Sequence, residues 1–213
     1  TLNTAITYAG DMIDASVLIG RLQTGGFSES IAQALFGDLS ATRQLLNVPT
    51  SIISAMCVSV LPTMAALHAL KEHSKKSVKA NEAYKLCYII AVPMTAGFAV
   101  FAKEAFTLLG YGENYNLLMA LSFSVILQGT VHLQSSILQS INRLFTSTLF
   151  LLSGAAIKLI LSYTLAAIPG LNIYGAVIST YVSLIVPFAL NQWVLNKKEN
   201  MGLSMDRRKK HGI

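Results

Sequence analysis

The chain has 213 residues, of which 53% are hydrophobic and only 12% are charged, and its mean hydropathy is +0.55. Because a soluble domain carries about a quarter charged residues, this composition excludes an ordinary soluble protein and indicates an integral membrane protein. The net charge of +6 raises nucleic acid as a partner. The positions of the basic residues, described below, favour membrane lipids instead, and we expect no nucleic-acid partner.

Six stretches are long enough to cross a bilayer, since about 20 mostly apolar residues span the hydrocarbon core. The sequence therefore predicts an all-α integral membrane fold, with a six-helix region over residues 1–195 and a basic tail over 196–213. Prolines inside three of the spans indicate either ordinary packing kinks or helices that bend around a cavity. The predicted spans cover approximately residues 2–20, 44–67, 83–106, 117–141, 145–168 and 173–195.

Residues 21–43 are predicted to connect the first two spans on the outer side. Gly25 and Gly26 end the preceding helix, and Ser28 or Ser30 caps the next piece. The middle of this connection is predicted to be a short amphipathic helix that lies on the membrane surface.

Basic residues gather in every second connection. Cytoplasmic connections of membrane proteins are enriched in Lys and Arg, so the pattern predicts that both ends of the chain are cytoplasmic and that the tail lies near anionic lipid. Only Arg21, Arg43 and Lys103 lie in the alternate connections. The twelve residues on the predicted cytoplasmic side, out of sixteen, are Lys71, Lys75, Lys76, Lys79, Lys85, Arg143, Lys197, Lys198, Arg207, Arg208, Lys209 and Lys210.

Asp11 and Asp14 lie one turn apart on the first predicted span and share a face with Thr4, Thr7 and Leu18. Two carboxylates in a membrane helix face protein or water rather than lipid. Either one is protonated, or a cation lies beside them. The alternative is that the helix begins near the interface and the aspartates lie at its outer end.

The fourth span carries a polar stripe. Gln128, His132 and Gln139 recur there at helical spacing, together with a serine at 135 or 136 and Arg143. Such groups hold helices together through hydrogen bonds in many membrane proteins. The functional interpretation is that the stripe lines a wet central cavity and binds a polar head group, and the sequence leaves both interpretations open.

Lys158 lies near the middle of the fifth span and is its only charged residue. A lone ammonium at that depth costs at least a few kcal/mol, so the fold has to give it a partner or water. The two cysteines, Cys57 and Cys87, both fall in apolar stretches and are predicted to be small buried hydrophobic residues. We expect no metal site and no cofactor.

Short motifs recur in a fixed order along the chain, and their order and spacing are more specific than any one of them. Together they resemble the stage V sporulation protein B and oligosaccharide flippase family, within the multidrug/oligosaccharidyl-lipid/polysaccharide exporter superfamily. The motifs are Leu35-Phe36-Gly37, Leu46 with Pro49, Ser59-Val60-Leu61-Pro62-Thr63, Val92-Pro93 with Gly97, Leu138-Gln139-Ser140 with Asn142-Arg143, Lys158, and Gly175-Ala176.

The resemblance implies a transporter of two six-helix lobes that works by alternating access. This chain looks like the second lobe, and because it begins with Thr1 we expect an N-terminal lobe to precede it. From related lipid II flippases, the resemblance implies that a carboxylate on the first helix of this lobe and polar groups on its fifth hold a coupling cation, sodium or a proton. Asp11 or Asp14 matches the first position, whereas Lys158 departs from the second.

Two hypotheses follow for Lys158. Its ammonium pairs with Asp11 or Asp14 in place of the cation, or it faces the cavity between the lobes and binds pyrophosphate directly. The resemblance implies that the protein flips a polyprenyl-pyrophosphate-linked sugar, a peptidoglycan or polysaccharide precursor, across the bacterial cytoplasmic membrane. The alternatives are a cation-coupled multidrug antiporter and a non-transporting scaffold for cell-wall synthesis. We expect no enzyme, because the outer connections lack a catalytic constellation.

Overall fold

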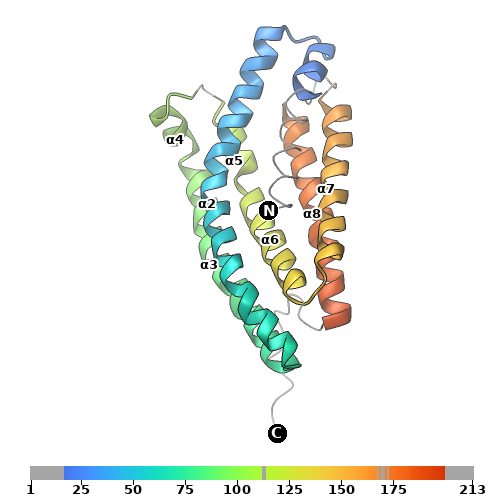
Figure 1. Ribbon diagram of the computed structural model, residues 1–213. Helices are drawn as coiled ribbons and strands as arrows, with labels where there is room; N and C mark the ends of the chain where they lie inside the picture. The colour runs from blue at the N-terminus through green and yellow to red at the C-terminus, as the bar shows by residue number, and fades with distance from the viewer. Residues whose placement is uncertain (1–16, 112–113, 167, 169–170, 172, 200–213) are drawn as a thin grey trace.

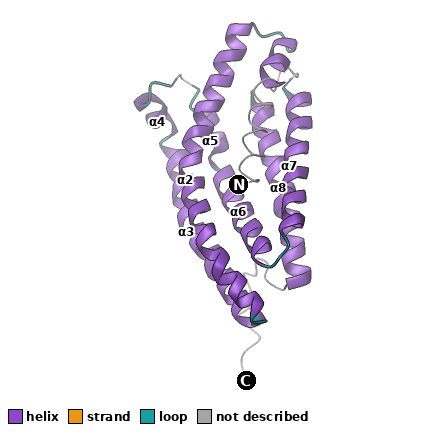
Figure 2. Ribbon diagram, viewed as in Figure 1, coloured by secondary structure: helices purple, strands orange, loops and turns teal. Residues whose placement is uncertain are grey.

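The computed structural model describes residues 17–111, 114–166, 168, 171 and 173–199, which are helical apart from short turns. The sites predicted at Asp11 and Asp14 and in the tail beyond residue 199 lie outside the described residues. Residues 17–24 form the end of a helix, and a turn at Gly25 and Gly26 follows it. The helices after it are α2 (Glu29–Ala69), α3 (His73–Val100), α4 (Ala102–Leu108), α5 (Asn116–Ser122), α6 (Ser124–Ser140), α7 (Leu144–Leu165) and α8 (Tyr174–Glu199) (Figures 1 and 2).

Within the described residues, five helical stretches are long and apolar enough to cross a membrane. These are α2, α3, α5 with α6, α7 and α8. They agree with five of the six predicted spans, and most of the predicted span at 2–20 is not described. The chain is thus an all-helical protein with several candidate membrane-spanning helices.

The predicted connection at 21–43 is wrong in its second half. Helix α2 runs without interruption through 41 residues from Glu29, so the expected surface helix is the beginning of the second span. The period-3.6 pattern of residues 29–43 continues into the predicted span that begins at Gln44, so the helix is not interrupted between them. Ser28 occupies the N-cap position but makes no capping bond.

Three other boundaries also differ from the prediction. Helix α3 begins at His73, ten residues before the expected span, so the lysine-rich residues before that span are also helical. Its far end stops at Val100, and the short α4 follows as a separate helix. The expected span 117–141 is divided into α5 and α6 by a turn at Phe123.

Helix α6 is the centre of the bundle. It contacts α2 and α3 on one side and α7 and α8 on the other, and Figure 1 shows the two helix pairs on either side of it. The α2–α3 and α6–α7 connections and the end of α8 lie at one end of the bundle. This end contains the predicted cytoplasmic basic residues of those connections and is called the lysine-rich end below.

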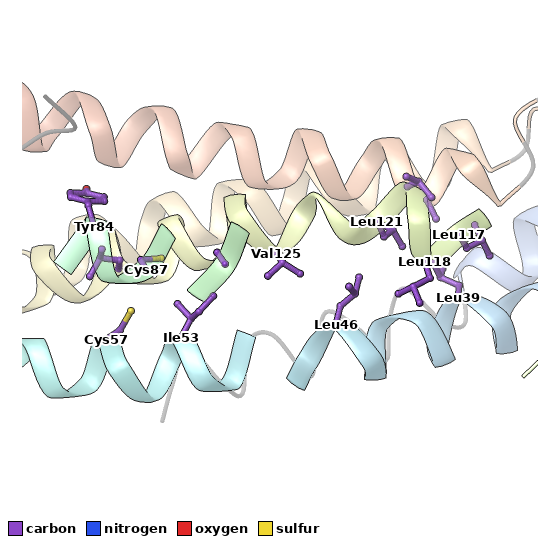
Figure 3. Close-up of a cluster of buried hydrophobic side chains, with 14 of the residues drawn as sticks. Leu39, Leu46, Ile53, Cys57, Tyr84, Cys87, Leu117, Leu118, Leu121 and Val125 are labelled. Atoms are coloured by element: carbon purple, nitrogen blue, oxygen red, sulfur yellow. The ribbon is translucent and has the colours of Figure 1, made fainter. Parts of the chain in front are cut away.

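The apolar core lies where α2, α3 and α6 meet. Ile53 and Cys57 of α2 point toward Cys87 of α3, and Val125 of α6 lies beside them (Figure 3). Cys57 and Cys87 are both buried and free. The prediction that they are buried small hydrophobic residues is therefore confirmed.

Candidate functional site

The polar stripe predicted on the fourth span lies on an accessible side of α6. His132 is exposed, and Gln128 and Gln139 are half-buried. This is unexpected for the central helix of a bundle, since its remaining positions from Gly129 to Leu138 are mostly buried. These three side chains therefore do not serve mainly as buried bonds between helices.

The contacts of α6 fix the direction of this stripe. Gly129 touches Ile53 of α2, because a Cβ built there would meet the Ile53 side chain at 2.9 Å. Gln134 lies on the other side and donates to Gln192 of α8 at 2.9 Å. Since a helix turns by about 100° per residue, Gln128 and His132 lie roughly at right angles to the α2 contact and away from α8. The stripe consequently lies on the side of α6 between α2 and α7.

Helix α2 carries a second polar stripe that the sequence analysis did not identify. Gln44, Asn47 and Ser51 are exposed and Ser54 is half-buried. Their spacing of three, four and three residues places them on one face of α2. That spacing lies wholly within the predicted span 44–67 and was therefore readable in the sequence.

The two stripes lie on the same side of the bundle. Helices α2 and α6 run in the same direction, and Ile53 lies level with Gly129. Ser51 and Ser54 are therefore at the depth of Gln128. The polar stripe of α2 lies roughly 100–180° around the helix from Ile53, so it turns away from the core-facing side that Ile53 and Cys57 mark.

We call these side chains of α2 and α6 the polar face. It presents amides, hydroxyls and one imidazole, groups that both donate and accept hydrogen bonds. Arg43 is half-buried one turn before Asn47 and is engaged in an interaction of its own. The polar face consists of Gln44, Asn47, Ser51, Ser54, Gln128, His132 and Gln139.

Lys158 has a different environment from the polar face. It lies one turn from Gly154 and one turn from Ser162, and both of these residues contact α8: Ser162 shares a 2.8 Å hydrogen bond with Ser179, and a Cβ on Gly154 would meet the Ser183 carbonyl oxygen at 2.5 Å. Lys158 is therefore on the α8-facing side of α7, where it is half-buried and engaged in an interaction. The hypothesis that it pairs with Asp11 or Asp14 concerns residues that are not described.

Acidic side chains are absent from a long part of the bundle. No Asp or Glu occurs in the sequence between Asn116 and Lys198, a stretch that includes α5, α6, α7 and nearly all of α8. Among the described residues no cluster of His, Cys, Asp and Glu could hold a metal ion. Among the described residues, the charged or titratable side chains closest in sequence to the polar face are Arg43, beside Gln44, and His132 within the face itself.

Comparison with known proteins found a distant relative. The chain is 25% identical over 189 residues to the uncharacterized membrane protein YabM of Bacillus subtilis (strain 168). The match covers 88% of this chain but 35% of that protein, so the chain spans about a third of the length of its relative. No family model matches the chain, and no solved structure matches it.

Proposed function

We propose that this chain is part of a transporter that moves a polyprenyl-pyrophosphate-linked sugar across the bacterial cytoplasmic membrane by alternating access. The observation that carries the proposal is the polar face. Exposed amide, hydroxyl and imidazole groups at mid-depth on two spanning helices are unfavourable against lipid and are typical of a substrate path. The similarity to a membrane protein supports the location but not the substrate.

The composition of the polar face favours a sugar head group. Amides and hydroxyls form hydrogen bonds with sugar hydroxyls in both directions, and no bond to the substrate has to be made or broken. The long polyprenyl tail remains in lipid along the apolar outer surfaces of the helices, which expose Val48 and Ile52 beside the polar stripe of α2.

The charge of the region favours an anionic substrate over a cationic drug. A drug antiporter needs carboxylates to attract its substrate, whereas no Asp or Glu occurs in the sequence from Asn116 to Lys198. Arg43 lies beside the polar face on α2 and Lys158 lies near the middle of α7, and a cation is what a pyrophosphate requires. The sugar, the coupling ion and the second lobe are parts of this proposal.

The test is an accumulation assay in cells depleted of their lipid II flippase, complemented with the full-length protein. We expect the wild type to prevent accumulation of the lipid-linked precursor. His132→Ala and Gln128→Ala should weaken rescue several-fold, and Lys158→Ala and Asp11→Asn with Asp14→Asn should abolish it. The matched control is Ile160→Ala, which also truncates an exposed side chain of a spanning helix but lies outside the polar face.

Two results contradict the proposal. Absence of rescue by wild-type protein that is folded and inserted would exclude lipid II, and the assay would be repeated with other polyprenyl-linked sugars. Full rescue by every polar-face variant would indicate a scaffold that recruits other proteins, because a scaffold does not need these side chains.

A further inference from the structure

Unpartnered buried polar atoms are concentrated in one layer of the bundle. Among the described residues, eight buried side-chain nitrogen or oxygen atoms lack a hydrogen-bond partner. Six of the eight belong to residues of α3, α6, α7 and α8 that lie toward the lysine-rich end. These atoms are the Tyr84 hydroxyl, Gln134 Oε1, the Ser135 and Ser147 hydroxyls, and Asn191 Oδ1 and Nδ2.

The helix register places these atoms at one depth. Helices α7 and α8 are antiparallel, with Ser162 opposite Ser179 and Gly154 opposite Ser183 and Pro187. Two turns further along α7, Ser147 lies opposite residues 190–194, which include Asn191. The Gln134–Gln192 hydrogen bond of 2.9 Å fixes α6 at the same level.

The side chains in this layer point inward. Asn191 is completely buried and lies between the α7-facing Pro187 and the α6-facing Gln192 on the surface of α8. The Tyr84 hydroxyl of α3 is directed toward Gln134 and interacts with it, although the two groups do not form a hydrogen bond of full geometry. Ser135 and Ser147 do not use the carbonyl of the preceding turn, although Ser124, Ser140 and Ser153 do so at 2.6–2.7 Å.

These groups require a ligand. A buried polar atom left without a partner costs about 1–3 kcal/mol, and buried polar groups in native proteins are paired with protein or ordered water. Carbonyl oxygens, hydroxyls and an amide N–H together provide both acceptors and donors.

The ligand that matches this set is neutral. None of the residues of the layer is acidic, and no Asp or Glu occurs between Asn116 and Lys198. The nearest acidic side chain on α3, Glu82, is paired with Lys79 at 2.9 Å. A metal cation in this layer would be a buried charge without a counter-charge, which is strongly unfavourable. Water, which both donates and accepts, satisfies all six atoms.

A route for water leads to the lysine-rich end. Gln134 is buried, Gln192 is half-buried and Asn196 is exposed. Gln134 donates to Gln192, and Gln192 donates to Asn196 at 3.5 Å. The three side chains thus form a ladder of polar groups from the surface into the layer.

We infer that the layer formed by Tyr84, Gln134, Ser135, Ser147 and Asn191 is a binding site for a small cluster of water molecules that enter from the lysine-rich end along α8. Gln134 turns away from the polar face toward α8, whereas Ser135 lies next to the polar stripe on the surface of α6. The inference does not rest on the proposed function. Its water adds to the direct Gln134–Gln192 hydrogen bond in linking α7 and α8 to α6.

The test is hydroxyl-radical footprinting of the full-length protein in lipid nanodiscs, with peptide-level mass spectrometry. Radicals formed by radiolysis of bound water modify the side chains beside it. We expect Tyr84 to be modified several-fold more than Met64 and Cys87, which are also buried and intrinsically more reactive but lie outside the layer. Asn191→Leu and Ser147→Ala should each reduce the modification of Tyr84.

The control variant is Ser179→Ala, which removes a buried hydroxyl that already has a partner and should leave the modification of Tyr84 unchanged. The inference is overturned if Tyr84 in the folded wild type is as unreactive as Met64. It is also overturned in favour of a cation site if thermal stability rises in sodium or potassium salt relative to choline salt and the rise is lost in Asn191→Leu.

Discussion

The α2–α3–α6 side of the bundle and the α7–α8 side are held together by different kinds of contact. Where α2, α3 and α6 meet, side chains such as Ile53 and Cys87 fill the space beside Gly129 (Figure 3). Between α7 and α8 the backbones themselves are close, at Gly154 and at Gly175, whose Cβ would meet Leu165 backbone atoms at 2.9 Å.

This difference reflects how helices associate when lipid is the solvent. Lipid tails are as apolar as leucine, so association depends on dispersion contacts and hydrogen bonds rather than on the hydrophobic effect. The α2–α3–α6 side obtains its contacts from interlocking side chains. The α7–α8 side obtains them from close backbones and from the Ser162–Ser179 hydrogen bond. Side chains can shift to accept a new atom, whereas backbone carbonyls cannot.

The largest expected effect is that of Gly154→Ala. The new methyl group would lie 2.5 Å from the Ser183 carbonyl oxygen and 3.2 Å from the Pro187 ring, so α7 and α8 have to separate. We expect a loss of stability of about 1–3 kcal/mol, which is typical of overpacking, measured as a lower Tm in detergent. Gly97→Ala is the matched control, since a Cβ at Gly97 meets nothing within 4 Å. Equal Tm values for the two variants would refute the close-backbone description.

A smaller effect is expected from Gly129→Ala on the other side of the bundle. Its methyl group would meet the Ile53 Cδ1 atom at 2.9 Å and the Cys87 sulfur at 3.4 Å, and both are side-chain atoms that can move. We expect a loss of about 1 kcal/mol, at the low end for overpacking. Combining Gly129→Ala with Ile53→Val should recover part of the Tm. A loss as large as that of Gly154→Ala would remove the contrast between the two sides.

The Ser162–Ser179 pair should contribute less than either glycine contact. Hydrogen bonds between membrane helices contribute about 0.6 kcal/mol on average. A double-mutant cycle with Ser162→Ala and Ser179→Ala, followed by unfolding free energies, measures this coupling directly. Additive effects of the two changes would mean that the bond contributes nothing beyond the separate side chains.

The smallest effect on stability is expected for His132→Ala. The imidazole is exposed among the described residues, so the unfolding free energy should change by about 0.5 kcal/mol or less. The transport assay should nevertheless register the change. A large loss of stability would assign His132 to helix packing and would weaken the argument for the polar face.

Much of the local description was predictable from the sequence. Hydropathy identified the spanning stretches from 44 onward, and the helical period placed Gln128, His132 and Gln139 on one face of their helix. The burial of Cys57 and Cys87 followed from their apolar neighbours. These are properties of segments of about 20 residues, and such segments express their periodicity whatever surrounds them. The orientation, with both ends in the cytoplasm, stays a prediction.

Other features were decided only by contacts between residues far apart in the chain. The open direction of the α6 stripe depends on Gly129 meeting Ile53 and on Gln134 meeting Gln192. The place of Lys158 on the α8-facing side of α7 depends on the pairing of Gly154 with Ser183. No periodicity encodes such pairs, because a helical pattern specifies which residues share a face but not which neighbour that face meets. Composition and periodicity therefore predict a helical membrane protein with a polar stripe. Contacts between residues far apart in the chain specify which side of the bundle that stripe occupies.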